Sequence, residues 1–179
     1  MEAKDLRWTG ERLVTSLSGD IVWEHLHRYA FANELALGKD VLDIACGEGY
    51  GSVLLASRAR SVTGVDLSLE ATRHAQGKYV KANLHFCVGD CRNIPLLPQS
   101  VDLVVSFETL EHVAEHELFL AEIRRVLRPG GTLVISSPDR ENYSDSRSTD
   151  STSGSAPALV QSDETVASRV QTDTNIASL

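Results

Sequence analysis

Three glycines stand at alternate positions, Gly47, Gly49 and Gly51, directly after a short apolar run that contains Asp43. Glycine has no Cβ, so the backbone there can turn sharply and come close to a bound ligand. The spacing favours a loop that cradles a small molecule at the start of a helix. Taken alone, the glycines fit a purely structural turn between a strand and a helix equally well.

An acidic side chain follows at the distance that is typical of a ribose-binding site. Asp66 ends the next apolar run, nineteen positions after Gly47, where a carboxylate can accept hydrogen bonds from both hydroxyl groups of a ribose. Nicotinamide dehydrogenases share this feature, but their GxGxxG spacing seats a pyrophosphate. This chain reads GxGxG after Asp43. The pattern favours a ligand with a ribose but no pyrophosphate, and a dehydrogenase stays as an alternative.

A cluster of histidines and glutamates lies further along the chain. His112, Glu115 and His116 form an HxxEH pattern, which on a helix can bind zinc. The sequence marks no third ligand, so we expect no metal site. A histidine titrates near neutrality, which suits a general base. We therefore expect His112, or Glu111 beside it, to act as the catalytic group that takes a proton from a hydroxyl group of the substrate. Alternatively, both residues simply begin the next helix.

The elements that must position these groups alternate between helix and strand. Apolar residues at three- and four-residue steps predict helices over 23–37, 50–59, 69–80 and 115–127, the last closed by the sequence RPGG; short apolar runs predict strands over 41–45, 61–66, 84–89, 101–107 and 132–137. This alternation is typical of an α/β fold with a doubly wound, Rossmann-like parallel sheet. Ligands of such sheets bind beyond the carboxyl ends of the strands.

The two ends of the chain differ from this middle part. We expect a lead segment over 1–22, the folded domain over 23–138, and a Ser/Thr-rich tail over 139–179 that is disordered. The apolar cluster at 156–160 is too short to build a core. The sheet would then end at 132–137 with an open edge, which is a liability for aggregation.

Length, charge and cysteine content narrow the function further. The 179 residues, 42% of them apolar, suffice for one domain, and a formal charge of -8 argues against nucleic acid as a partner. Cys46, Cys87 and Cys91 form no disulfide pattern, which suits a reducing cytoplasm. No stretch is long and apolar enough for a signal peptide or a membrane span. We therefore expect a small-molecule or uncharged acceptor, no membrane association and a cytoplasmic location.

Five segments together resemble the successive motifs of class I S-adenosylmethionine-dependent methyltransferases: VLDIACGEGYGS, VTGVDLS, VGDCRNIP, VDLVVSFETLEHV and RVLRPGGTLVISSP. They occur in the order and at the spacing of that family, over 41–138. The segments WTGERLVT and WEHLHRYAFA are also similar to bacterial members that act on sugars or surface-polysaccharide precursors. The resemblance implies S-adenosylmethionine as the cofactor and a small-molecule or saccharide acceptor.

The resemblance also implies a cofactor site at ten positions: Asp43, Gly47, Gly49, Gly51, Asp66, Leu67, Asp90, Cys91, Phe107 and Glu108. The glycine loop would cradle the methionine part, and Asp66 would hold the ribose. Asp90 and the amide of Cys91 would contact the adenine edge, while the pair at 107–108 would line the methyl-transfer cleft. Simpler alternatives are a helix-terminal charge for Asp66, a loop cap for Asp90 and a solvated carboxylate for Glu108.

The reaction that follows is an in-line displacement in which an acceptor oxygen, nitrogen or carbon takes the methyl group. Alignment of the two reactants can supply about 7–11 kcal/mol to such a reaction. Complete family members continue past the fifth strand with more helix and two further strands, which this sequence does not offer. The second hypothesis is therefore a catalytically silent domain that binds the cofactor or a partner.

Overall fold

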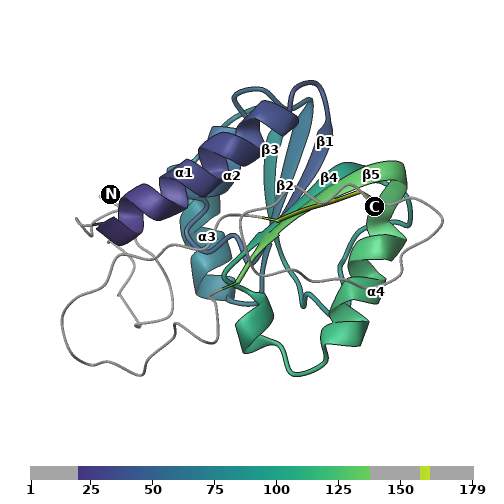
Figure 1. Ribbon diagram of the computed structural model, residues 1–179. Helices are drawn as coiled ribbons and strands as arrows, with labels where there is room; N and C mark the ends of the chain where they lie inside the picture. Colours follow the sequence, from purple (N-terminus) through teal and green to yellow (C-terminus); the bar gives the residue numbers. More distant parts are fainter. Residues whose placement is uncertain (1–19, 138–157, 162–179) are drawn as a thin grey trace.

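The computed structural model describes residues 20–137 and 158–161 (Figure 1). Its helices are α1 (Asp20–Leu35), α2 (Tyr50–Leu55), α3 (Leu69–Lys78) and α4 (His116–Val126), with a short 3-10 helix, η1 (Leu110–His112). Its strands are β1 (Asp40–Ile44), β2 (Ser61–Asp66), β3 (Leu84–Val88), β4 (Val101–Phe107), β5 (Leu127–Ser136) and β6 (Ala158–Gln161). The predicted alternation of helix and strand is confirmed. The lead segment up to residue 19 and most of the tail lie outside the described residues, while residues 20–22 belong to α1.

All the strands belong to one sheet with the order β3-β2-β1-β4-β5-β6. The strands from β1 to β5 pair in parallel. The chain starts in the middle with β1, moves outward to β3, and returns to the other side of β1 with β4. This reversal between β1 and β4 is the switch point of a doubly wound sheet, so the predicted fold class is confirmed.

The edge of the sheet differs from the prediction. The expected open edge at 132–137 is wrong, because β6 pairs antiparallel with β5, from Thr132 opposite Gln161 to Ile135 opposite Ala158. The pairing of β6 with β5 depends on backbone hydrogen bonds, and four residues are too few to show an alternating apolar pattern. In addition, β5 begins at Leu127 and not at Thr132. A register shift in the pairing with β4 absorbs the RPGG segment that we expected only to close the helix.

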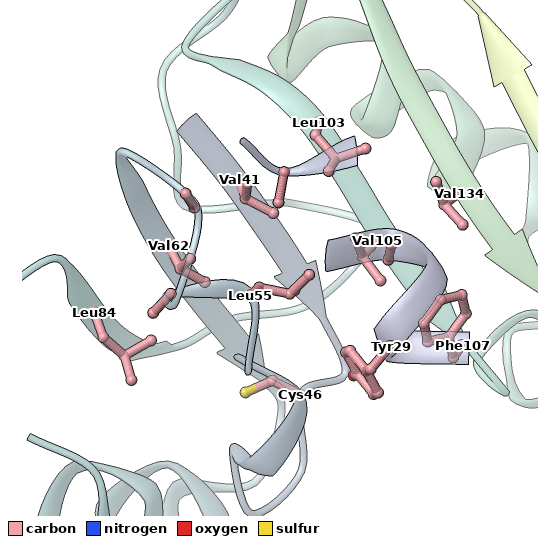
Figure 2. Close-up of a cluster of buried hydrophobic side chains, with 14 of the residues drawn as sticks. Tyr29, Val41, Cys46, Leu55, Val62, Leu84, Leu103, Val105, Phe107 and Val134 are labelled. Carbon is pink, nitrogen blue, oxygen red and sulfur yellow. The ribbon is translucent and has the colours of Figure 1, made fainter. Parts of the chain in front are cut away.

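Helices cover both faces of the sheet (Figure 1). One buried cluster packs α1, α2 and α3 against the sheet, and Figure 2 shows Tyr29 of α1 beside Phe107 in that cluster. A second cluster packs Phe119, Ile123 and Val126 of α4 against the opposite face. Val41 and Leu42, neighbours on β1, point into different clusters. The central strand is therefore buried on both faces, which explains its continuous apolar run.

Within the described ranges, no helix combines the length and the apolar character needed to cross a membrane.

Candidate functional site

A cavity of about 520 Å³ lies at the carboxyl ends of the strands, where the switch point places it. The ends of four strands and the start of the α4 connection contribute its walls: residues 44–47, 65–67, 89–92, 107–109 and 112–115, together with His25, Tyr29 and Tyr50. The structure thus brings eight predicted site residues to one cavity: Gly47, Asp66, Leu67, Asp90, Cys91, Phe107, Glu108 and His112. Four others lie outside its lining: Asp43, Gly49, Gly51 and Glu111.

The glycine loop is tied directly to the end of β2. The backbone amide of Gly47 donates to Asp66 Oδ2 at 2.8 Å, and the amide of Ser68 donates to Oδ1 at 2.8 Å. Ser68 is the N-cap of α3, so the alternative of a helix-terminal role for Asp66 has a counterpart in the structure. A carboxylate oxygen can accept more than one hydrogen bond. The ribose role of Asp66 stays a prediction that is compatible with these contacts.

Asp43 lies beneath this loop and is fully buried. The Tyr29 hydroxyl donates to its Oδ1 at 3.0 Å, and the Ser52 hydroxyl donates to its Oδ2 at 2.5 Å. Burial raises the pKa of Asp43 to about 7, against the effect of these two hydrogen bonds. Its carboxyl group therefore joins α1, β1 and α2 below the cavity. Sequence analysis did not identify Ser52, although its hydroxyl group stands one residue after the glycine pattern.

Packing explains why two of the loop positions are glycine. A Cβ at Gly51 would lie 2.0 Å from Cζ of Tyr29, and a Cβ at Gly49 would lie 2.7 Å from Cζ of Phe86. Gly49 also has a φ of 85°, which side chains rarely adopt. These two glycines admit aromatic rings from α1 and β3. Their cofactor role stays a prediction, because neither lines the cavity.

One face of α1 forms the remaining wall of the cavity. Tyr50 and His25 are hydrogen-bonded through the hydroxyl group and Nδ1, at 3.1 Å, and Arg28 Nη1 lies 3.1 Å from Glu108 Oε1. The ring of Tyr29 meets those of Tyr50 and Phe107 edge to face, with centroids 5.4 and 4.9 Å apart. Figure 2 shows the rings of Tyr29 and Phe107. Burial, with help from the charge of Arg28, lowers the pKa of His25 to about 4. The imidazole at the cavity wall is therefore neutral near pH 7.

Glu108 is held in a specific conformation at the end of β4. Its φ is 50°, its amide donates to the Ser136 carbonyl at 3.0 Å, and the Ser136 hydroxyl donates to its Oε1 at 3.0 Å. Together with the Arg28 contact, these bonds fix the carboxylate against the cavity. The alternative of a merely solvated carboxylate does not describe this residue. Ser136 could have been anticipated only from the neighbouring ends of β4 and β5.

Arg92 dominates the opposite end of the cavity. Its backbone amide and its guanidinium donate to Asp90, at 2.8 Å from N and 2.7 Å from Nη2, and its Nη1 lies 2.9 Å from Glu115 Oε2. The Arg92 guanidinium lowers the pKa of Asp90 to about 2. Asp90 therefore caps this loop, as the simpler alternative has it. Its contact with adenine, and that of the Cys91 amide, stay predictions.

The HxxEH pattern does not converge on one point. Glu115 pairs with Arg92, and a ring nitrogen of His116 lies 3.0 Å from the Leu110 carbonyl. In the part of the chain that the structure describes, no cluster of three potential metal ligands occurs. His112 is more than half exposed and lines the cavity, whereas Glu111 accepts a hydrogen bond from Ser137 at 3.2 Å. Of the two catalytic candidates, His112 is the one at the cavity.

The chain is similar to proteins that are named as methyltransferases. A Mycolicibacterium smegmatis protein named as a probable S-adenosylmethionine-dependent methyltransferase is 36% identical over 143 residues, which cover 79% of this chain and 55% of the relative. A fatty-acid O-methyltransferase from the same organism is 35% identical over 96 residues, 52% of this chain and 35% of that protein. The chain spans about half the length, or less, of these curated relatives.

A solved structure leads to the same class. A chain of the Haloferax volcanii complex between the Trm112 methyltransferase activator and a methyltransferase has 31% identity and a TM-score of 0.59. The match covers 64% of this chain and 53% of the other. The family model described as a methyltransferase domain matches residues 42–135, more than half of the chain. The chain belongs to the methyltransferase-domain family.

Proposed function

We propose that this chain binds S-adenosylmethionine in the cavity at the carboxyl ends of the strands and transfers its methyl group to a small-molecule or saccharide acceptor. The observation that carries the proposal is the hydrogen bond between the Gly47 amide and Asp66 at the mouth of a doubly wound sheet. It joins the two sequence features that favour a ribose-bearing ligand without a pyrophosphate. Membership of the methyltransferase-domain family supports the same ligand.

The residues present fit this cofactor. A cavity of about 520 Å³ is within the range of roughly 300–1,000 Å³ that is typical of small-molecule sites. S-adenosylmethionine carries an ammonium and a sulfonium group, and four carboxylates line the cavity: Asp66, Asp90, Glu108 and Glu115. Aromatic rings at Tyr29, Tyr50 and Phe107 offer apolar walls and π faces suited to a cation. Shape and charge therefore agree.

When bound, S-adenosylmethionine supplies an electrophilic methyl group on a positively charged sulfur. The chain contributes orientation: Asp66 holds the ribose, the loop around Gly47 cradles the methionine part, and Phe107 with Glu108 borders the transfer cleft. His112, which lines the cavity, accepts a proton from the substrate at a ring nitrogen. These residues align reactants and exclude water, which is the main catalytic requirement of a displacement.

For the acceptor, we infer a hydroxyl-bearing small molecule or saccharide. His25, Glu108 and His112 line the cavity and can all form hydrogen bonds. One relative is named as a fatty-acid O-methyltransferase, which is consistent with an oxygen acceptor. The WEHLHRYAFA segment, similar to bacterial enzymes that act on sugars, contains His25 and favours the saccharide.

The test is transfer of a tritiated methyl group from S-adenosylmethionine to panels of hydroxylated small molecules and saccharides. His112→Asn should lower kcat by about 10²–10⁴-fold, because a general base is lost, and leave the cofactor Kd near that of the wild type. His116→Asn, the same change four positions later, is the matched control and should retain activity. Wild-type activity in His112→Asn would remove this residue from the mechanism. Saturable cofactor binding with no transfer to any acceptor would favour the silent-domain hypothesis.

A further inference from the structure

Arg28 of α1 forms an ion pair with Glu108, a carboxylate that lines the cavity. Its side chain is 7% exposed, and its Nη1 lies 3.1 Å from Glu108 Oε1. The helix that carries it precedes the region matched by the family model, which begins at residue 42. The partner, Glu108, lines the cavity and is 23% exposed. A residue outside the region matched by the family model therefore forms an ion pair with a carboxylate that lines the cavity.

The charges that line the cavity are unbalanced. Arg92 serves both Asp90 and Glu115, and Asp66 accepts hydrogen bonds from backbone amides of Gly47 and Ser68. Among the described lining residues, four carboxylates thus face one guanidinium, and Arg28 stands behind the fourth carboxylate. Because the Arg28 side chain is buried, its charge interacts more strongly with Glu108 than two exposed charges would. Carboxylates outnumber guanidinium groups in the described lining of the cavity, and Glu108, the carboxylate of the Arg28–Glu108 pair, lies next to Phe107 in the sequence.

We propose that Glu108, partly neutralised by Arg28, determines how strongly the site prefers S-adenosylmethionine over S-adenosylhomocysteine. This inference rests on the proposed function. The two molecules share every group except the methyl, and only the first carries a positive charge on sulfur. A carboxylate in the wall attracts the sulfonium and is indifferent to the neutral thioether. Glu108 is then a specificity-determining residue that limits inhibition by the product, and the charge of Arg28 offsets part of its effect.

Substitutions of Arg28 and Glu108 should change the preference between the two ligands in opposite directions. Arg28→Gln removes a cation that repels the sulfonium and offsets Glu108, so the ratio of the Kd of S-adenosylhomocysteine to the Kd of S-adenosylmethionine should rise. Glu108→Gln removes the attraction, so this ratio should fall. Each change should be about three- to tenfold, the effect of one partly screened charge across a cavity. If the pair were only a structural brace, either substitution would weaken both ligands by the same factor.

The experiment is calorimetric titration of both ligands, S-adenosylmethionine and S-adenosylhomocysteine, into the full chain at low and at high salt, with thermal unfolding of each variant. Arg28→Lys keeps the charge and should keep the ratio within about twofold. Glu34→Gln is the control, because it removes an α1 ion pair with Arg58 that lies on the surface. If Arg28→Gln does not fold, Glu108→Gln and Arg28→Lys still decide the question.

Opposite shifts of the ratio, reduced at high salt, would support the proposal. A ratio that Glu108→Gln leaves unchanged, in a chain that binds both ligands, would overturn it. Absence of binding of either ligand to the folded wild type is a different result, because it contradicts the proposed function itself.

Discussion

The two ends of the sheet use charged side chains in different ways. At the amino end, where the strands begin, Asp40 and Asp102 each contact both Arg60 and Arg128, at N–O distances from 2.5 to 3.1 Å. Acid and base are equal in number there, and they join the starts of β1, β2, β4 and β5. At the carboxyl end, carboxylates outnumber cations around an open cavity. At the amino end the acidic and basic side chains pair with one another and stabilise the fold. At the carboxyl end the excess carboxylates can interact with a bound ligand.

The largest effect is expected at Gly51, which supports the carboxyl end from below. In Gly51→Ala, the new Cβ would lie 2.0 Å from the buried Tyr29 ring, so α1 must shift. We expect a loss of about 3 kcal/mol in the free energy of unfolding, the upper part of the usual range for overpacking. Gly77→Ala is the matched control: nothing lies within 4 Å of its Cβ, and in a helix it should stabilise by about 0.5–1 kcal/mol. Urea unfolding measures both, and equal stability of the two variants would contradict the packing of Tyr29.

The next effect concerns binding at the carboxyl end. Asp66→Ala removes the acceptor of the Gly47 amide and of the ribose hydroxyls. We expect S-adenosylmethionine to bind more weakly by on the order of 1–3 kcal/mol, about 5- to 150-fold in Kd. Asp102→Ala, which removes an aspartate from the amino end, is the control and should leave the Kd unchanged. If calorimetry finds equal Kd values for both variants, the division of labour between the two ends is wrong.

Asp43 and Asp40 lie on the same strand, and their pKa values are shifted in opposite directions. The pH dependence of stability should therefore differ between the two ends of the sheet. The pKa of Asp43 is raised by burial to about 7, far above the ordinary value of about 3.9. Between these values the unfolded chain releases a proton that the folded chain keeps, so stability falls as the pH rises. The unfolding equilibrium constant should grow by at most about tenfold per pH unit and then level off above pH 7. Asp43→Asn should lack this slope in urea titrations from pH 5 to 8, and an unchanged slope would refute the assignment.

The smallest effect is expected at Asp40. Hydrogen bonds from Arg60, with a further contribution from Arg128, hold the pKa of Asp40 well below its usual range. Its stabilisation is therefore present above the ordinary carboxyl pKa and is lost as the pH falls through the lowered one. Asp40→Asn should lower the melting temperature at pH 7 by at most about 4 °C, with a smaller difference in acid and no change in cofactor affinity. A variant that melts lower by the same amount at every pH would contradict the ion-pair explanation.

The sequence was sufficient for the features that depend on local pattern. The strand over 101–107 and the one ending at Asp66 match the structure, because buried parallel strands are continuous apolar runs. The shared cavity of Gly47, Asp66 and Asp90 followed from the rule that strand ends meet at one edge. Family resemblance added the roles of these residues, which binding experiments must now test.

Features that depend on distant contacts were not predictable. Gly51 is required by the ring of Tyr29, twenty-two positions earlier, and nothing in the loop itself indicates that contact. The fixed conformation of Glu108 needs Arg28 from α1 and Ser136 from β5. Likewise, β6 is defined by its partner strand and has no periodic pattern of its own. In each case the missing information was which elements become neighbours in three dimensions.

The most direct test of the account is calorimetric titration of S-adenosylmethionine into the full chain, with circular dichroism and light scattering on the same sample. We expect a folded, unaggregated protein that binds one equivalent of S-adenosylmethionine saturably, and S-adenosylhomocysteine should compete for the same site. A folded protein that gives no binding heat with either molecule across pH 6 to 8, and no thermal shift, would contradict the central claim that the carboxyl end of this sheet is a cofactor site.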